Sequence, residues 1–597
     1  MRALSLALVL LLPAGVASAA SPQQALDQGI RVTFDTQAGT QPGDATAFHF
    51  ELRDSASGRP LSGVRPAAWL GLRRDPAKPA ADCKRQIAGY LAGDLFSRAE
   101  VDLNSYFVLA MNDEASISVV DPLFGFGGSK LLALLELEKP GADWQLTPER
   151  DRLFVSQPLA SKVAVADTSG WRVTAQVATG PNPRQLVQNA DHIWVADDAG
   201  VTRIDRRSLA SQAVPLGKVA GIALDGAGER LVAAVGDSLQ VIDAHDARRL
   251  GSIGLDGRPQ RLAWSDAAKA FYALDAQQGR VFVFDASERR LRGEIAVDSG
   301  ASQIRFAPGG RFALLPNPQR NRLQVLDSST NTIVQNADIS GGPDQVSFTP
   351  LLAYVHRRDS ETVQMIALEQ LGQAGRPLNV AEFPAGQSAL GAAPEDGADS
   401  IVAAPEGPAV LVANASDKMI YLYREGMAAP AGGFRTYGRK PRAVLVVDHG
   451  LREGRRGEYT TRMPVVRPGT YDVALFADSP RLAVCFPFTL ADTQPRPDVP
   501  RVVALAPPAE LTVGQPAQLR FALLDAAGGR RESADLHALA LLAPGIWQRR
   551  SALTARSDGS YELAFTPPQP GIYYVWIESN ALGLARRHRQ FLIYEAR

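Results

Sequence analysis

The sequence predicts an all-β protein, in which an eight-bladed β-propeller (seven blades is the alternative) is inserted in an immunoglobulin-like β-sandwich and followed by a second β-sandwich. Three observations predict this architecture. Short apolar strands recur with a period of about 40 residues across residues 104–449. A hairpin motif containing glycine, tyrosine and proline occurs twice after these repeats. A segment near the N-terminus aligns with a segment of the C-terminal region.

The N-terminal residues 1–20 have the composition of a secretory signal peptide. Arg2 precedes an apolar run over residues 3–12, which is too short to span a bilayer, and the small residues 17–19 form a cleavage site. No later segment contains about 18 consecutive apolar residues. We therefore expect a soluble mature protein that is periplasmic or secreted and has no transmembrane segment.

The balance of charge bears on whether the protein binds nucleic acid, and the number of cysteines bears on whether it contains a disulfide. Lys and Arg number 63, as do Asp and Glu, so bulk charge gives no argument for a nucleic-acid partner. The two cysteines are Cys83 and Cys485. In an oxidising compartment an isolated pair indicates a disulfide, and two buried free thiols are the alternative.

Six repeats end their third strand on an aspartate. Asp, Ser and Thr after such a strand can hydrogen-bond the next turn, so we interpret these aspartates as structural. The strands are SISVVD ending at Asp121, KVAVAD at Asp167, GVTRID at Asp205, SLQVID at Asp243, RVFVFD at Asp285 and RLQVLD at Asp327. Two degenerate copies, VQMIAL and KMIYLY, bring the count to eight. Residues 440–450 would supply the first strand of the first blade and close the ring.

The repeat units resemble a known family. The unit RLQVLDSSTNTIVQNADISGGPDQVSFTP, residues 322–350, resembles the YVTN-type propeller repeat and is similar to the haem-d propeller of periplasmic nitrite reductases and their assembly proteins. The resemblance covers roughly residues 104–449. It implies an envelope location and makes a noncovalent haem or metal at the propeller mouth one hypothesis. The sequence has no CxxCH motif for covalent haem attachment.

Two hairpins after the repeats share one plan, in which a Gly-x-Tyr is followed twelve residues later by a Pro-Gly-x-Tyr. The tyrosines are Tyr459 and Tyr471 in the first hairpin, and Tyr561 and Tyr573 in the second. Pro-Gly turns between alternating strands are typical of immunoglobulin-like sandwiches.

The sandwich that contains the first hairpin is predicted to be split by the propeller. Residues 43–70 align without a gap with the segment that starts at Gly514. We therefore expect residues 31–95, with a helical linker, and residues 451–492 to be two halves of one sandwich, and residues 501–597 to be a second sandwich. A Cys83–Cys485 disulfide would join the two halves.

Candidate ligand-binding residues lie in the loops between the second and third strands of the repeats. Propellers commonly surround their central opening with this edge. Asn and Asp also suit tight turns without any function, which is the alternative. His356 could ligate haem or a metal, and Arg357 suits carboxylates or phosphates. The candidates are Asn112, Asp197, Asp275, Asn317, His356, Arg357 and Asn414.

The function expected from the sequence is non-enzymatic binding or scaffolding in the envelope. HExxH, paired CxxC and GxSxG motifs are absent, and no catalytic residue is predicted. The partner would be an unidentified envelope protein or a small ligand. The alternative is a redox-associated subunit or assembly factor that binds haem, a metal or another cofactor at the propeller mouth.

Overall fold

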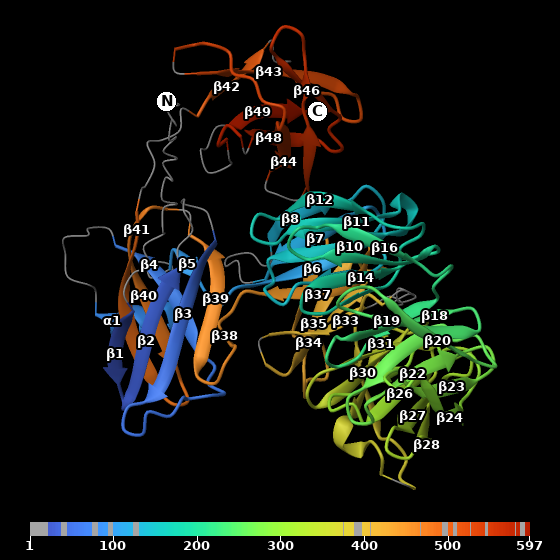
Figure 1. Ribbon diagram of the computed structural model, residues 1–597. Coiled ribbons are helices and arrows are strands. Elements are labelled where there is room, and N and C mark those ends of the chain that lie inside the picture. The colour runs from blue at the N-terminus through green and yellow to red at the C-terminus, as the bar shows by residue number, and fades with distance from the viewer. Residues whose placement is uncertain are drawn as a thin grey trace, which may run out of the picture. The chain divides into compact units, whose positions relative to one another are not determined.

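A computed structural model describes most of the chain, and many of its elements are labelled in Figure 1. The signal peptide predicted at residues 1–20 lies outside the described residues. Within them, no helix is long and apolar enough to cross a membrane. The described residues are 22–37, 45–73, 82–92, 99–122, 130–373, 375–386, 397–405, 407–465, 467–491, 499–505, 510–525, 527–543, 547–579, 581–584 and 591–597.

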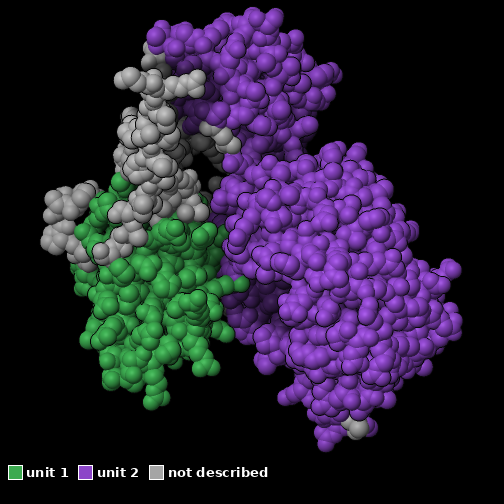
Figure 2. Space-filling view, in the orientation of Figure 1, with its two compact units in different colours: residues 1–105, 449–496 green, residues 106–448, 497–597 purple. Residues whose placement is uncertain are grey.

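The chain divides into two compact units, which Figure 2 shows in different colours. The first consists of residues 1–105 and 449–496, and the second of residues 106–448 and 497–597. The first unit is therefore built from two segments that are far apart in the sequence. Almost the whole of the segment between them forms repeated four-stranded sheets.

Eight antiparallel four-stranded sheets are formed by the described residues of 106–448. In chain order, sheet 1 is β37 (Pro441–Asp448), β6 (Tyr106–Asn112), β7 (Ser116–Asp121) and β8 (Lys130–Glu136); sheet 2 is β9 (Trp144–Leu146), β10 (Arg152–Gln157), β11 (Lys162–Asp167) and β12 (Arg172–Ala178); sheet 3 is β13 (Leu186–Gln188), β14 (His192–Ala196), β15 (Gly200–Asp205) and β16 (Ser211–Pro215); and sheet 4 is β17 (Gly221–Leu224), β18 (Arg230–Val235), β19 (Ser238–Asp243) and β20 (Arg249–Gly254).

Sheet 5 is β21 (Arg261–Ser265), β22 (Ala270–Asp275), β23 (Arg280–Asp285) and β24 (Arg290–Ala296); sheet 6 is β25 (Arg305–Phe306), β26 (Phe312–Asn317), β27 (Arg322–Asp327) and β28 (Thr332–Asp338); sheet 7 is β29 (Pro343–Phe348), β30 (Leu352–Arg357), β31 (Thr362–Ala367) and β32 (Val380–Pro384); and sheet 8 is β33 (Ile401–Ala403), β34 (Ala409–Asn414), β35 (Met419–Arg424) and β36 (Gly432–Arg435). Two short 3₁₀ turns, Pro158–Ala160 and Leu368–Gln370, interrupt the connections.

Each sheet buries both of its faces against its two neighbours. For example, Phe154 and Val163 of sheet 2 share one hydrophobic cluster with Ile193 and Val195 of sheet 3. Similar clusters join every successive pair, and the last one joins sheet 8 to sheet 1. Burial on both faces explains why the strands are almost continuously apolar instead of alternating. A closed ring of four-stranded sheets joined in this way is a β-propeller.

The ring closes within sheet 1, as the sequence predicted. Strand β37 from the end of the propeller pairs antiparallel with β6 from its beginning, with Leu445 opposite Leu109 and Asp448 opposite Tyr106. The first strand of this sheet thus comes from the opposite end of the segment to the other three. Separating the two ends of the propeller would break a full strand pairing.

The aspartates that end the third strands are structural, as interpreted from the sequence. In Asp285 the Oδ1 atom accepts hydrogen bonds from the backbone N–H groups of Ser287 (2.9 Å) and Glu288 (3.1 Å). Asp167, Asp205 and Asp327 cap the following turn in the same manner. Such Asx-type turns explain why an aspartate recurs at this position of the repeat.

The first unit consists of two sheets that pack against each other. One has the order β1 (Gln23–Asp27), β2 (Ile30–Gln37), β3 (Ala45–Asp54), β39 (Glu458–Pro464) and β38 (Arg452–Glu453), and the other has the order β41 (Leu482–Leu490), β40 (Gly469–Ala477), β4 (Ala67–Leu72) and β5 (Val101–Asp102). Both sheets mix strands from the two chain segments. Across the interface, the rings of Phe34 and Phe486 stack with centroids 5.0 Å apart.

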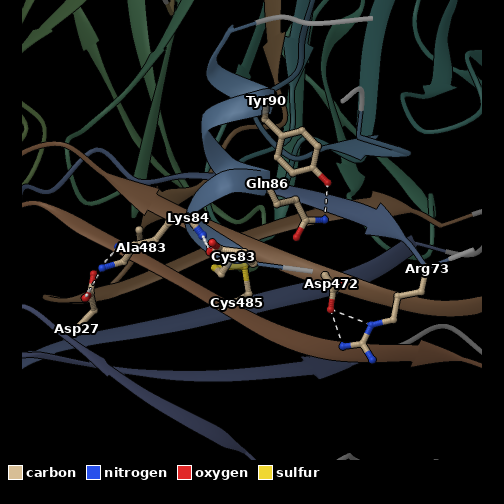
Figure 3. Close-up of a disulfide and its surroundings, with 10 residues drawn as sticks. Asp27, Arg73, Cys83, Lys84, Gln86, Tyr90, Asp472, Ala483 and Cys485 are labelled. Atoms are coloured by element: carbon tan, nitrogen blue, oxygen red, sulfur yellow. Dashed lines mark hydrogen bonds and ion pairs between the residues drawn. A yellow bond between two sulfur atoms is a disulfide. The ribbon is translucent and has the colours of Figure 1, made fainter. Parts of the chain in front are cut away.

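A disulfide joins Cys83 and Cys485, which confirms the predicted pairing. Cys83 begins helix α1 (Cys83–Ala92), and Cys485 lies in β41 (Figure 3). The helix also packs Ile87 into the interior, and its Tyr90 ring lies 5.6 Å from that of Trp69. The bond therefore links the first chain segment of this unit to the second across 402 residues of sequence.

The C-terminal region forms two further sheets around one hydrophobic core. Their orders are β42 (Arg501–Leu505), β43 (Ala517–Leu524), β47 (Tyr561–Phe565) and β46 (Thr554–Ala555), and β45 (Trp547–Ala552), β44 (His537–Leu542), β48 (Gly571–Glu578) and β49 (Phe591–Ala596).

The repeated tyrosines have the same role in both regions. The hydroxyl groups of Tyr471 and Tyr573 each donate to the carbonyl oxygen four residues upstream, on Arg467 and Gln569. The hydroxyl groups of Tyr459 and Tyr561 each accept a backbone N–H, from Val64 and Ser533. These bonds satisfy buried phenol groups and fix the turns, which explains the recurrence of the motif.

Removing the disulfide is predicted to destabilise the first unit selectively. With the propeller folded, the loop that the bond closes is short, and the chain-entropy model gives a loss on the order of 4 kcal/mol for Cys83→Ala/Cys485→Ala. Thermal unfolding with limited proteolysis should show residues 22–105 and 449–491 becoming susceptible at a lower temperature, while the propeller transition stays in place. If the wild type and the double variant became susceptible to proteolysis at the same temperature, a stabilising role of the disulfide would be contradicted.

The turn-capping aspartates are predicted to make the free energy of unfolding decrease at low pH. Burial alone would raise the pKa of Asp285, but hydrogen bonds from Ser287, Glu288 and Arg292 lower it to about 2, from an ordinary value of 3.8. Because the folded pKa is the lower one, this carboxylate stabilises the fold above about pH 4, and the contribution is lost as the pH falls to about 2. Between these values, the free energy of unfolding should decrease more steeply for the wild type than for Asp285→Asn, and parallel profiles would contradict the assignment.

Candidate functional site

The residues predicted to surround the propeller mouth lie at or next to the ends of the second strands. Their side chains are buried, with exposed fractions of 5% or less. They are Asn112 of β6, Asp197 after β14, Asp275 of β22, Asn317 of β26, His356 and Arg357 of β30, and Asn414 of β34. What they contact decides whether they are available to a ligand.

Most of these side chains hold the protein's own backbone. Asn317 donates to the carbonyl oxygen of Ser299 (2.8 Å) and accepts from the N–H groups of Gln319 and Arg320. Asp275 accepts from the N–H of Arg258 (2.7 Å), in the segment that enters its sheet, and from two N–H groups of its own turn. One side chain therefore fixes both the turn after the second strand and the segment that enters the first strand.

We call a side chain that holds the segment entering the first strand in this way a latch, and latches recur around the ring. Asp197 accepts from the N–H of Gly180 (3.2 Å), Arg357 donates to the carbonyl oxygen of Ser340 (3.0 Å), and Asn414 donates to that of Ala385 (2.9 Å). Asn112 differs, because its amide donates to the hydroxyl groups of Ser116 and Ser118. The polar pattern that the sequence shows at these positions thus has a structural cause.

His356 lies behind the wall of the opening. Its exposed fraction is 1%, and its Nδ1 is 2.5 Å from Oδ1 of Asp344. The other carboxylate oxygen of Asp344 lies 3.5 Å from Nε of Arg358. Asp344 and Arg358 line the opening, so His356 reaches it only through the Asp344 carboxylate.

A cavity of about 1050 Å³ lies where the first strands of sheets 3–7 come together. Its wall consists of the segments that enter the first strands and of the turns after the second strands, which is the predicted edge. The wall residues follow directly after the buried latches: Ala276 and Gln277 come after Asp275, Pro318 and Gln319 after Asn317, and Arg358 and Asp359 after Arg357. These wall residues are thus the sequence neighbours of the polar residues that were predicted to line the cavity.

Side chains at the start of the first strands connect neighbouring sheets around the cavity. Asp143 accepts from the N–H of Leu186 (2.7 Å), joining sheet 2 to sheet 3. Gln303 accepts from the N–H of Val346 (3.0 Å), joining sheet 6 to sheet 7. Similar bonds run from Gln185 to Ile222 and from Gln345 to Ser400. We call these four side chains, of Asp143, Gln185, Gln303 and Gln345, the inner belt. They are polar because they accept hydrogen bonds from backbone N–H groups that have no partner in a neighbouring strand.

The strongest charge interaction at the cavity is the pair formed by Arg305 and Asp399. The guanidinium binds both carboxylate oxygens, with Nη2 2.8 Å from Oδ2, and Nη1 also donates to the carbonyl oxygen of Val346. The Asp399 charge raises the pKa of Arg305. The Arg305 side chain nevertheless keeps 35% of its surface exposed, because it lines the cavity.

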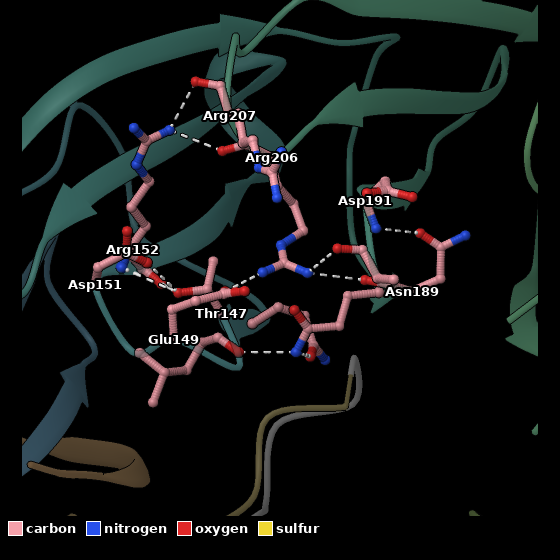
Figure 4. A network of polar contacts seen from close by, with 12 residues as sticks. Thr147, Glu149, Asp151, Arg152, Asn189, Asp191, Arg206 and Arg207 are labelled. Carbon is pink, nitrogen blue, oxygen red and sulfur yellow. Dashed lines mark hydrogen bonds and ion pairs between the residues drawn. The ribbon is translucent and has the colours of Figure 1, made fainter. Parts of the chain in front are cut away.

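Arginines at the other ends of the strands are used differently. Arg206 of sheet 3 is buried and donates to the carbonyl oxygens of Asn189 and Ala190 and to the carboxylate of Glu149 (Figure 4). Arg152 donates to the carbonyl oxygens of Arg206 (2.8 Å) and Arg207 (3.0 Å). These guanidinium groups fasten turns of sheets 2 and 3 together.

A second hollow of about 390 Å³ lies between sheets 3 and 4 and contains His192 and His245. Burial, with a further contribution from the nearby Arg203, lowers the pKa of His192. Its Nδ1 is buried and has no hydrogen-bond partner among the described residues. The described part of the chain contains no group of three or more His, Cys, Asp or Glu side chains placed to hold a metal ion.

No protein-family model matches the sequence, and no curated protein matches it. Solved structures similar to the fold include hydrazine synthase from Kuenenia stuttgartiensis, with 17% identity, a TM-score of 0.37 and coverage of 48% of this chain and 96% of that one. Apo AztD from Citrobacter koseri has 12% identity and a TM-score of 0.44, over 58% of this chain and 98% of that one. At these values the similarities carry no argument about function.

A latch and its neighbour on the cavity wall are predicted to respond differently to substitution. Asn317→Ala removes three partly buried hydrogen bonds to the backbone and should lower the free energy of unfolding by about 1 to 3 kcal/mol. Gln319→Ala, two residues away and exposed, should change it by less than about 0.5 kcal/mol. Urea denaturation of both variants measures this difference, and a stable Asn317→Ala protein would show that the latch is dispensable.

Proposed function

We propose that this protein is an exported, non-enzymatic binding protein whose ligand site is the cavity at the centre of the propeller. The observation that carries the proposal is the cavity of about 1050 Å³ with a charged and amide-rich wall contributed by sheets 3–7 and the segment that enters sheet 8. Pockets of this size suit small molecules, and polar groups that converge from several elements fix a ligand's orientation. Because the inner belt and the latches hold the wall, the site is preorganised.

The proposed architecture is a propeller of eight blades, one for each four-stranded sheet, which is inserted in one immunoglobulin-like sandwich and followed in the sequence by a second. Support for eight blades comes from the eight sheets and from the cluster that joins sheet 8 to sheet 1. The pairing of β3 with β39 and of β4 with β40 supports residues 31–95 and 451–492 as halves of one sandwich, and the separate core of the C-terminal sheets supports residues 501–597 as the second. The YVTN-type assignment of the repeats is part of the same proposal.

Export to the periplasm or beyond rests on two features. The first 20 residues have the pattern of a signal peptide. The Cys83–Cys485 disulfide is of a kind that persists in oxidising compartments and is rare in reducing ones.

The alternative, a redox-associated protein with a haem or metal at the mouth, has weaker support. A haem or metal needs a donor side chain that reaches the cavity, whereas His356 is buried behind Asp344. Residues on the wall do not otherwise form a ligand set that fits such a group. An absorption spectrum and metal analysis of protein purified from its exported compartment test this alternative, which a Soret band or stoichiometric iron or copper would favour.

Narrowing the cavity is predicted to weaken ligand binding. Ala276 lies on the wall, so Ala276→Trp should reduce the amount of any small molecule that native mass spectrometry detects on the purified protein and any thermal shift that a metabolite library produces. Ala210→Trp is the matched control, because Ala210 is in an exposed turn of sheet 3 and lines neither hollow. Equal binding by the two variants would place the ligand elsewhere, and binding of an envelope protein alone would make the propeller a scaffold.

A further inference from the structure

We infer that the cavity binds a small organic oxyanion, a molecule carrying carboxylate or phosphate groups, and that Arg305 is the residue that recognises it. The inference rests on the proposed function, since it assigns a ligand class to the same cavity. Three properties of the wall carry it: lining arginines that outnumber the lining carboxylates, unused N–H donors on Arg305, and amide groups whose oxygen atoms are already occupied.

Arginines outnumber carboxylates among the residues that line the cavity. Four arginines line the cavity, Arg184, Arg261, Arg305 and Arg358, together with the carboxylates of Asp344 and Asp359. Behind the wall, the charges of Asp399 and Asp143 act on Arg305 and offset part of this positive charge. Asp344 is already engaged by His356 and Arg358, as described above. Positive charge in a cleft with protein walls raises the local concentration of anions and disfavours cations.

Arg305 has donors to spare despite its ion pair. A guanidinium carries five N–H groups. Three of them are used, by the two oxygens of Asp399 and the carbonyl oxygen of Val346. The N–H on Nε and the second N–H on Nη2 have no partner among the residues that the structure describes, and the side chain is accessible from the cavity. Two N–H groups in a planar fork match the geometry of a carboxylate or phosphate.

Asp399 adds to the function of Arg305 by fixing its position. Asp399 precedes β33 in sheet 8, while Arg305 begins β25 in sheet 6, so the pair reaches past sheet 7. Because the carboxylate holds one side of the guanidinium, the side chain loses little conformational freedom when an anion binds the other side. Arg305 is therefore a preorganised anchor instead of a mobile surface charge.

Two glutamines on the wall are oriented as donors. The Oε1 atoms of Gln185 and Gln303 accept backbone N–H groups of Ile222 (2.9 Å) and Val346 (3.0 Å). An N–H donor must face the amide oxygen, so the Nε2 group is the one left over on each side chain. Neither Nε2 has a partner within the described chain, and both residues line the cavity. Amino groups presented in this way favour ligand oxygen atoms.

The size of the cavity defines the ligand further. A volume of about 1050 Å³ lies at the upper end of the range of small-molecule pockets and far exceeds what one inorganic oxyanion fills. The arginines come from sheets 3, 5, 6 and 7, on different parts of the wall. A metabolite-sized molecule with more than one oxyanion group would engage several of them at once.

Calorimetric titration of the intact mature protein tests this inference with three probes: citrate for carboxylates, glucose 6-phosphate for phosphates, and glucose as the neutral match of the second. We expect citrate, glucose 6-phosphate or both to bind, with affinity that falls as the salt concentration rises, and glucose not to bind. Binding by citrate alone or by glucose 6-phosphate alone identifies the oxyanion that the site prefers.

The decisive variant is Arg305→Gln/Asp399→Asn, in which two neutral side chains replace the ion pair so that no charge is left unpaired. We expect at least a tenfold loss of affinity, and a smaller loss for Arg305→Lys, which keeps the charge and loses the fork. Arg358→Gln, nearer the exposed rim, tests the wall again should the double variant unfold. Arg249→Gln is the control, because Arg249 is exposed on β20 and does not line the cavity.

Unchanged affinity in Arg305→Gln/Asp399→Asn and Arg358→Gln would overturn the inference, as would tighter binding of glucose than of glucose 6-phosphate. A neutral compound that binds the wild type and is lost in Ala276→Trp would also overturn it while leaving the proposed function intact. If no compound binds in the cavity of the wild type, the proposed function fails together with the inference.

Discussion

Closure of the propeller ring is the constraint on which the rest of this structure depends. Each sheet buries both faces, so an open ring would expose one apolar face at each end. The pairing of β37 with β6 prevents this by placing strands from the two ends of the propeller in one sheet. The same pairing brings residues 105 and 449 together, and the backbone N–H of His449 bonds to the carbonyl oxygen of Ser105 (3.0 Å). A sandwich can therefore be interrupted by more than 300 residues without its halves being separated.

The first unit shows how the halves use this proximity. Each of the two sheets contains strands from both segments, so neither segment has a complete core of its own. The disulfide then fastens the helix of the first segment to the last strand of the second. Backbone pairing, a shared core and a covalent bond all join the two segments of this unit.

The cavity wall illustrates how a rigid scaffold leaves groups available for binding. Buried latches such as Asn317 spend their polar atoms on the backbone, and exposed neighbours such as Gln319 stay accessible. Arginines divide in the same way. Arg206 spends its contacts on joining sheets 2 and 3, whereas Arg305 is oriented by Asp399 and keeps two N–H groups for the cavity. In the proposed function, stability and binding thus depend on different residues of the propeller.

The sequence by itself determined the propeller, the strand that closes it, the mixing of the two outer segments and the disulfide. These features follow from the sequence repeats, the apolar runs and the number of cysteines, all of which can be read directly from the sequence. It also indicated the edge of the propeller that surrounds the cavity. Most of the residues predicted to bind a ligand are latches and not wall residues, because Asn and Asp are common in turns whether they contact a ligand or their own backbone. Only the tertiary structure decided that Arg305 meets Asp399, 94 residues away, since the curvature of the ring brings the sixth sheet to the eighth and no local pattern encodes that distance.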